Sequence, residues 1–178
     1  MSQIHVILLI ALNIAAAETQ DAQDGKSKYL RTRELGTYFN IKMYWKSGYR
    51  WQGSTSEKKW CMKCISNSCS RGSGIKIEKC DTGDSRQQFY YDDGRIRSRK
   101  NKAACFERDG RSIKLRSCSD SRDQKWDELS KSNSFQLKIP GNNSKCASQH
   151  HHPKSGEKIY MTSCKLSSSN RTDKWIVY

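Results

Sequence analysis

The chain has 178 residues, with 33 Lys and Arg against 18 Asp and Glu, which gives a formal net charge of +15 at pH 7. This length suits one domain and is too short for two domains that each bury a sizeable core. A charge of this size attracts polyanions, although a Lys-rich surface also serves simply to keep a protein in solution. The charge therefore gives no information on the fold.

The start of the chain has the pattern of a targeting segment. Residues 4–17 form a short apolar run that ends in three alanines, before a polar stretch that begins at Glu18. This pattern predicts a signal peptide over residues 1–17, cleaved near Glu18, and hence a secreted, extracellular protein. A spanning helix needs roughly 20 apolar residues, so no membrane span is expected. Residues 18–34 form a polar leader without apolar periodicity.

Short alternating segments follow the leader, and they predict strands. Phe39, Ile41, Met43 and Trp45 alternate with polar residues such as Asn40, so one face of this strand would be buried and the other wet. The pattern recurs as Phe135, Leu137 and Ile139 around Gln136 and Lys138. Segments 75–77, 113–115 and 159–161 are too short for helices and are separated by turn residues. The class is therefore expected to be all-β.

One pattern recurs three times along the chain. In each copy a cysteine is followed, eight to eleven residues later, by the aromatic residue of a polar-x-aromatic triplet. The triplets are Gln87-Gln88-Phe89, Gln124-Lys125-Trp126 and Asp173-Lys174-Trp175. Their spacing falls in the range typical of a repeated supersecondary unit, so three such units are expected to stack or close on themselves.

These triplets resemble the Gln-x-Trp signature of the ricin B-type lectin family, and the resemblance covers residues 35–178. It implies a β-trefoil, in which three four-stranded units surround a pseudo-threefold axis and the triplet aromatics meet in a shared core. An aromatic ring buries a large apolar area, and a buried glutamine amide can satisfy backbone groups at a turn. Most of the motif is therefore expected to be scaffold rather than a sugar contact.

Eight cysteines in an oxidising compartment predict disulfides. The resemblance implies one bond across the hairpin of each unit, with the pairs Cys105–Cys118 and Cys146–Cys164. In the first unit Cys61, Cys64 and Cys69 compete for Cys80. The residues on either side of Cys61 match those around Cys105, which favours Cys61–Cys80 and leaves Cys64 to join Cys69.

The resemblance also implies where a sugar would bind. A galactose pocket of the family combines an acidic residue two places after the first cysteine, an aromatic platform two places before the second, and a polar residue just before the triplet. The second unit comes nearest, and Glu107, Asp123 and Gln124 are the predicted carbohydrate-binding residues, but Arg116 occupies the platform position. The corresponding positions elsewhere hold Lys63 (or Ser66), Glu78, Arg86, Ser148, Thr162 and Thr172. Without a ring to stack on, ordinary galactose binding is not expected.

A second candidate surface is basic. Arg95, Arg97 and Arg99 alternate along the chain, so a strand would place their guanidinium groups on one face, about 7 Å apart, and Lys114 and Arg116 could extend it. Guanidinium groups match carboxylates and sulfates well, which makes these five residues a candidate anion-binding surface. A solvated strand face is the competing interpretation.

The remaining motifs give weaker predictions of function. His150-His151-His152 would point to alternating sides of an extended segment before Pro153, so no metal site is expected. The mature chain has no other histidine, and no nucleophile, base and orienting acid can be assembled, so the protein is predicted not to be an enzyme and to need no cofactor. Asn142 and Asn170 begin glycosylation sequons.

Together these features predict a secreted, non-catalytic carbohydrate-binding module, lectin-like and favouring anionic or sulfated glycans. The alternative is a secreted trefoil with degenerate sugar sites that binds a secreted or cell-surface protein. Nucleic acid is not an expected partner, because the aromatic residues are mostly committed to the core and few remain for base stacking.

Overall fold

The computed structural model describes residues 37–43, 60–131, 134–141, 145–149, 154–164 and 175–177. Within these ranges the chain forms strands, two short 3₁₀ turns and no α-helix, so the predicted all-β class is confirmed. The predicted signal peptide and polar leader, Trp45, the histidine tract and both sequons lie outside them. No helix of the described ranges is long and apolar enough to cross a membrane.

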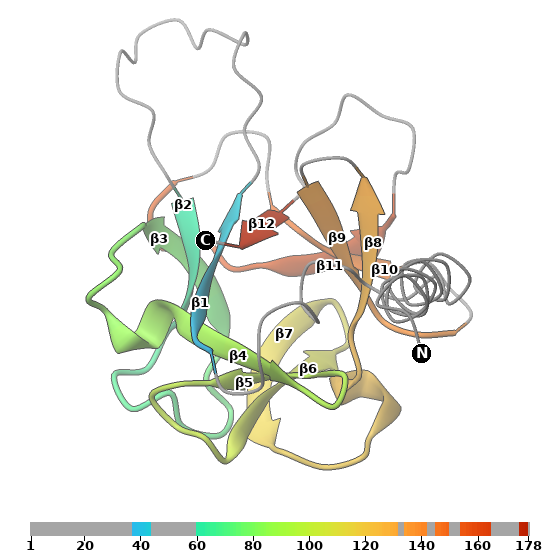
Figure 1. The fold of residues 1–178 in the computed structure, drawn as a ribbon, viewed down its shortest axis with the longest axis horizontal. Helices are drawn as coiled ribbons and strands as arrows, with labels where there is room; N and C mark the ends of the chain where they lie inside the picture. Colours follow the sequence, from blue (N-terminus) through green and yellow to red (C-terminus); the bar gives the residue numbers. More distant parts are fainter. Residues whose placement is uncertain are drawn as a thin grey trace, which may run out of the picture.

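Among the described residues, twelve strands fall into three consecutive units of four (Figure 1). The first unit contains β1 (Phe39–Met43), β2 (Trp60–Cys64), β3 (Ile75–Lys79) and β4 (Gln88–Asp92). The second contains β5 (Arg95–Ser98), β6 (Ala104–Asp109), β7 (Ser112–Ser117) and β8 (Asp127–Lys131). The third contains β9 (Ser134–Lys138), β10 (Lys145–Ser148), β11 (Tyr160–Ser163) and β12 (Trp175–Val177).

The outer strands of each unit build a barrel wall, and the inner two form a hairpin. Antiparallel ladders join β1 to β4 and to β12, β4 to β5, β8 to β9, and β9 to β12. Pairing of the first strand with the last brings the two ends of the folded domain together. The hairpins are β2–β3, β6–β7 and β10–β11.

The three hairpins also contact one another. Gly74 pairs with Lys114 between the first and second hairpins, and Lys76 pairs with Lys158 between the first and third. Tyr160 of the third hairpin pairs with Ser112 of the second. Because every hairpin touches both others, they form a closed three-part cap, and the units follow one another around the molecule (Figure 1).

The triplet aromatics occupy the core, as predicted. Phe89, Trp126 and Trp175 are fully buried in one apolar cluster. Phe106 packs edge-on against both Phe89 and Trp126, at centroid distances of 4.9 and 6.4 Å. The Trp126 indole N–H donates to the carbonyl of Phe106 at 3.1 Å, and that of Trp175 donates to Ala147 at 3.0 Å. Both acceptors directly follow the first cysteine of their hairpin, so the two units repeat the same contact.

All four predicted disulfides are present, including the first-unit pairing that the sequence only favoured. Three bonds span the hairpins with Cα–Cα distances of 4.9 to 5.1 Å: Cys61–Cys80, Cys105–Cys118 and Cys146–Cys164. The fourth joins Cys64 and Cys69, and it closes a short loop after β2.

The first two triplet glutamines have the predicted scaffold role. Each ends a 3₁₀ turn (Ser85–Gln87 or Arg122–Gln124) and is buried. The Gln87 amide donates to the carbonyl of Lys79 at 2.9 Å and accepts from the backbone N–H of Asp81 at 3.0 Å. Gln124 makes the same two bonds around Cys118. These amides satisfy backbone groups that flank a disulfide, where the strand ladder ends.

Two side chains expected on a wet strand face are instead buried: Asn40 and Gln136 are each 4% exposed. The alternating pattern assumed a sheet with one solvated side. In the barrel, however, the Asn40 amide donates to the carbonyl of Gln87 at 3.0 Å, so the turn of the same unit covers it. The first hairpin cysteine of each unit pairs with Lys42, Arg97 or Lys138. The residues two places before these partners are therefore equivalent in the three units, and they are Asn40, Arg95 and Gln136.

Candidate functional site

The predicted sugar site of the second unit is assembled from β6, β7 and the turn Arg122–Gln124. The Gln124 amide donates to Glu107 Oε2 at 2.7 Å, so these two predicted residues are in direct contact. Gln124 is only 1% exposed, and its amide already bonds two backbone groups. It therefore positions the Glu107 carboxylate and is not itself available to a ligand.

Asp123 lies beside this pair and is held from the other side. Arg108 donates to Asp123 Oδ1 from Nε at 2.8 Å and from Nη2 at 2.7 Å. The Asp123 side chain is 39% exposed, and its Oδ2 has no partner among the residues that the structure describes. Asp123 and Glu107 thus present carboxylate oxygens that can accept hydrogen bonds from hydroxyl groups.

Arg116 occupies the position at which the family pattern would place a stacking aromatic ring. Its side chain is 41% exposed, donates to Asp109 Oδ2 at 3.1 Å and lies 3.7 Å from Glu107 Oε1. Lys114 reaches the same Asp109 oxygen at 2.5 Å. The Lys114 hydrogen bond and charge hold the pKa of Asp109 below its usual range, so this carboxylate stays ionised. The cluster offers exposed acceptors and exposed cations together, but no apolar platform.

A concavity of about 560 Å³ lies at the equivalent place in the first unit. It is lined by Lys63, Glu78, Lys79, Cys80, Asp81, Thr82, Asp84 and Gln87. Lys63 stands where a carboxylate was expected, and Asp84 on the opposite side supplies the acid, with Lys63 Nζ 2.8 Å from Asp84 Oδ2. Arg86 also bonds Asp84, and this hydrogen bond holds the pKa of Asp84 well below its usual range.

Asp84 is not among the predicted site residues, because those positions were counted only from the cysteines and from the triplet. The signal was present, since a lysine at the acidic position is offset by an aspartate three places before Gln87. In the third unit Ser148 is fully buried, which removes it from the ligand surface, and Thr172 lies outside the described residues.

The predicted anion-binding surface is divided by the structure. Arg95 and Arg97 do lie on the outer face of β5, alternating with buried Ile96 and Ser98. Arg95 is clamped by Asp93 at 3.0 Å and Asp120 at 3.1 Å, and Arg97 contacts Asp92 at 2.8 Å. Lys114 and Arg116 share Asp109. Arg99 alone of the five has no carboxylate partner within the described part of the chain.

The described residues contain no group of three His, Cys, Asp or Glu side chains that could hold a metal ion.

This fold is a β-trefoil, and similarity to solved structures agrees with it. A designed threefold-symmetric protein, ThreeFoil, matches with a TM-score of 0.59 at 14% identity, over 79% of this chain and 96% of its own. The C-half of an earthworm R-type lectin, solved in complex with GalNAc, matches with a TM-score of 0.55 at 14% identity, over 79% and 96%. A non-toxic homologue of type II RIPs from Momordica charantia (bitter gourd), in complex with α-methyl-D-galactoside, matches with a TM-score of 0.59 at 16% identity. That match covers 80% of this chain and 48% of the gourd protein.

Residues 40–126 match the family model of the ricin-type β-trefoil lectin domain. Over these residues the chain therefore carries the ricin-type β-trefoil lectin domain that its triplets and cysteines indicated. No curated protein sequence matches the chain.

Proposed function

We propose that this protein is a secreted, non-catalytic carbohydrate-binding module whose second-unit site favours glycans that carry acidic groups. Carbohydrate binding is what membership of the lectin family implies. The observation that supports the preference for acidic glycans is the exposed Arg116 guanidinium, which lies 3.7 Å from the Glu107 carboxylate.

In this proposal the two carboxylates accept hydrogen bonds from sugar hydroxyls, and Arg116 binds a carboxylate or sulfate of the same glycan. Gln124 fixes Glu107 through its 2.7 Å hydrogen bond, which lowers the cost of ordering the site. Arg116 must first loosen its contact with Asp109. An exposed ion pair of this kind contributes only about 0–1 kcal/mol, so a glycan anion can replace it at little cost.

The ligands of the similar solved structures support a carbohydrate as the ligand, and the residues of this chain support acidic groups on that carbohydrate. The earthworm and gourd proteins were solved with GalNAc and α-methyl-D-galactoside, which are neutral sugars. In this chain a guanidinium replaces the platform that would stack on a neutral sugar face. We therefore expect acidic saccharides to bind more tightly than their neutral counterparts.

A glycan array read at two salt concentrations, followed by calorimetry on the best acidic saccharide, tests this function. We expect Glu107→Gln and Arg116→Ala each to weaken binding about tenfold, the loss of roughly 1.4 kcal/mol. Lys154→Ala is the matched control for Arg116→Ala, because Lys154 is exposed on the third hairpin and its loss removes the same single positive charge, whereas Glu107→Gln changes the charge in the opposite direction. Equal loss in the control, or an array without any bound glycan, contradicts the proposal; the latter result favours a protein partner.

Secretion has its own test. The full chain is expressed in a eukaryotic secretory host, and the intact mass of the protein in the medium is measured before and after glycosidase treatment. We expect a chain that begins near Glu18 and carries glycans at Asn142 or Asn170. Retention of residues 1–17, or failure to reach the medium, contradicts it.

A further inference from the structure

The turn between β5 and β6 carries a group of cations that the second-unit site does not use. Arg99, Lys100 and Lys102, here called the basic turn, are all exposed. Between Gly94 and Ala104 the sequence contains no Asp or Glu. The acidic partners of β5 gather at its opposite end, around Arg95, so within the described part of the chain the basic turn has no carboxylate partner.

The backbone of the basic turn is held rigidly by Asn101. Its side chain donates to the carbonyl of Cys69 at 3.3 Å and accepts from the backbone N–H of Ala103 at 3.2 Å. Its backbone N–H donates to the Ser98 hydroxyl at 3.3 Å, and its carbonyl accepts from Ala104 at 2.9 Å. Lys100 and Lys102 therefore project from a fixed loop on either side of this anchor.

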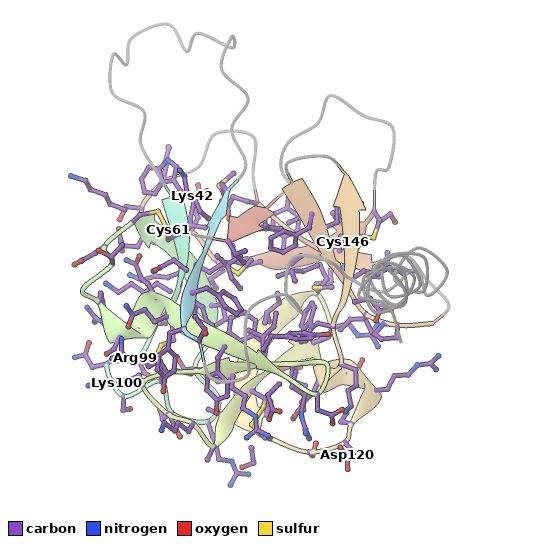
Figure 2. All side chains as sticks on the ribbon, in the orientation of Figure 1. Lys42, Cys61, Arg99, Lys100, Asp120 and Cys146 are labelled. Atoms are coloured by element: carbon purple, nitrogen blue, oxygen red, sulfur yellow. A yellow bond between two sulfur atoms is a disulfide. The ribbon has the colours of Figure 1, made fainter. Side chains whose placement is uncertain are left out.

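Arg99 is also held in place. Its guanidinium lies over the ring of Tyr38, 4.5 Å from the centroid, and donates to Gln88 Oε1. Tyr38 in turn packs edge-on against Tyr90 at 5.7 Å. Stacking orients the guanidinium plane and leaves its remaining N–H groups at the surface, where Figure 2 shows Arg99 and Lys100 at the margin of the molecule.

We propose that the basic turn is a second binding site that takes the sulfate groups of a sulfated polysaccharide. An oriented guanidinium and two lysines on an anchored loop, without competing carboxylates, match closely spaced oxyanions. The basic turn shares no residue with the site of Glu107 and Arg116, so its charges can be removed without changing that site. A protein with both sites binds one acidic chain at two points or links two chains.

The surroundings favour a sulfated glycan over other polyanions. Arg99 lies over the ring of Tyr38, and Tyr38 makes an edge-to-face contact with Tyr90, so these two rings beside the basic turn are already engaged and are poor platforms for a nucleic-acid base. Among the described residues Ile65 is the one exposed large hydrophobic side chain, which gives little apolar surface for insertion into a lipid bilayer.

The test measures heparin binding by the full mature chain, using surface plasmon resonance at several salt concentrations. We expect the double variant Lys100→Ala/Lys102→Ala to bind heparin about tenfold more weakly, with a shallower dependence on salt. The control, Lys154→Ala/Lys158→Ala, removes the same charge from exposed lysines of the third hairpin and should change binding little. Equal losses in both variants would show that net charge alone binds heparin, and the proposal fails.

A second variant distinguishes an ordered binding site from non-specific electrostatic attraction. Asn101→Ala keeps every cation but removes the anchor, so we expect weaker heparin binding at unchanged net charge, measured well below the melting temperature. Desulfated heparin, RNA of equal charge and anionic vesicles serve as competing probes, and equal binding of any of them overturns the assignment to sulfate. The loss of heparin binding caused by Lys100→Ala/Lys102→Ala should persist when Arg116 is also replaced by alanine, and Lys100→Ala/Lys102→Ala should leave short array saccharides bound at the second-unit site, so the two proposals fail separately.

Discussion

Single residues in this trefoil serve either the scaffold or the surface, and burial decides which. Gln124 belongs to the family signature and was predicted to contact sugar, yet its amide is consumed by Ser117, Ser119 and Glu107. Arg95 was predicted to bind anions, but it occupies the position equivalent to Asn40 and is clamped near the turn of its unit. Residue type alone does not separate these roles.

Removal of a triplet glutamine is expected to destabilise the fold. Gln87→Ala leaves the carbonyl of Lys79 and the N–H of Asp81 without their partner, and each partly buried unpaired group costs about 1–3 kcal/mol. Urea unfolding monitored by tryptophan fluorescence should show a loss of about 2 kcal/mol or more. Gln88→Ala is the neighbouring control, since Gln88 is only partly buried, and a comparable loss there would contradict the argument.

At the level of elements, the first and third hairpins are joined by a backbone bridge and by a hydrogen bond to a carboxylate. Glu78 on β3 accepts hydrogen bonds from Ser155 of the third unit and, at 2.9 Å, from Lys76. These two hydrogen bonds, Ser155 first, hold the pKa of Glu78 below its ordinary value. The contact between the first and third hairpins is therefore strongest while Glu78 is ionised.

This contact predicts a pH dependence of stability. The pKa of Glu78 is lower in the folded state than in the unfolded state. The stability that Glu78 contributes is therefore complete above the unfolded pKa, about 4, and is lost as pH falls through the folded pKa. We expect the free energy of unfolding of the parent protein to be higher than that of Glu78→Gln by about 1 kcal/mol or less at about pH 6. This difference should vanish near about pH 2. Thermal unfolding at several pH values measures it, and a difference that grows on acidification would refute it.

Each hairpin disulfide should act as a local staple. Cys105 and Cys118 close a loop with a sequence separation of 13, and a bond of this kind contributes about 3 kcal/mol in the chain-entropy model. The double variant Cys105→Ser/Cys118→Ser should lose about that much in urea unfolding. Cys64→Ser/Cys69→Ser, which opens a loop of separation 5, should lose less, and the reverse order would contradict this view.

For the whole molecule, stability depends on closing the barrel around three buried rings. Trp175 pairs with Met43 and with Phe135, so it joins the last strand to the first unit and to its own. No single unit buries its aromatic residue alone, because Phe89, Trp126 and Trp175 share one cluster.

Loss of the closing ring should therefore affect the entire fold. Trp175→Ala removes a fully buried indole and leaves the carbonyl of Ala147 unpaired, which should cost about 3–5 kcal/mol. Calorimetry should show one cooperative transition at a markedly lower temperature. Ile65→Ala, at a side chain that is 40% exposed, is the control, and similar melting of the two variants would contradict the shared core.

The amino-acid pattern and the family resemblance predicted the all-β class, the three units, the disulfides Cys105–Cys118 and Cys146–Cys164 and the three core aromatics, whereas the first-unit disulfide pairing was only favoured. These features depend on local alternation and on a pattern that repeats along the chain, so they can be read without knowing which segments meet. Which charges remain unpaired depends on the folded structure. Asp92 and Asp93 reach Arg97 and Arg95 across the β4–β5 hairpin. Asp120 reaches Arg95, and Asp84 reaches Lys63, because the fold brings together residues that lie far apart in sequence. Ion pairing and burial depend on the folded structure. For this reason only Arg99, among the five predicted anion-binding residues, belongs to the basic turn at the end of β5.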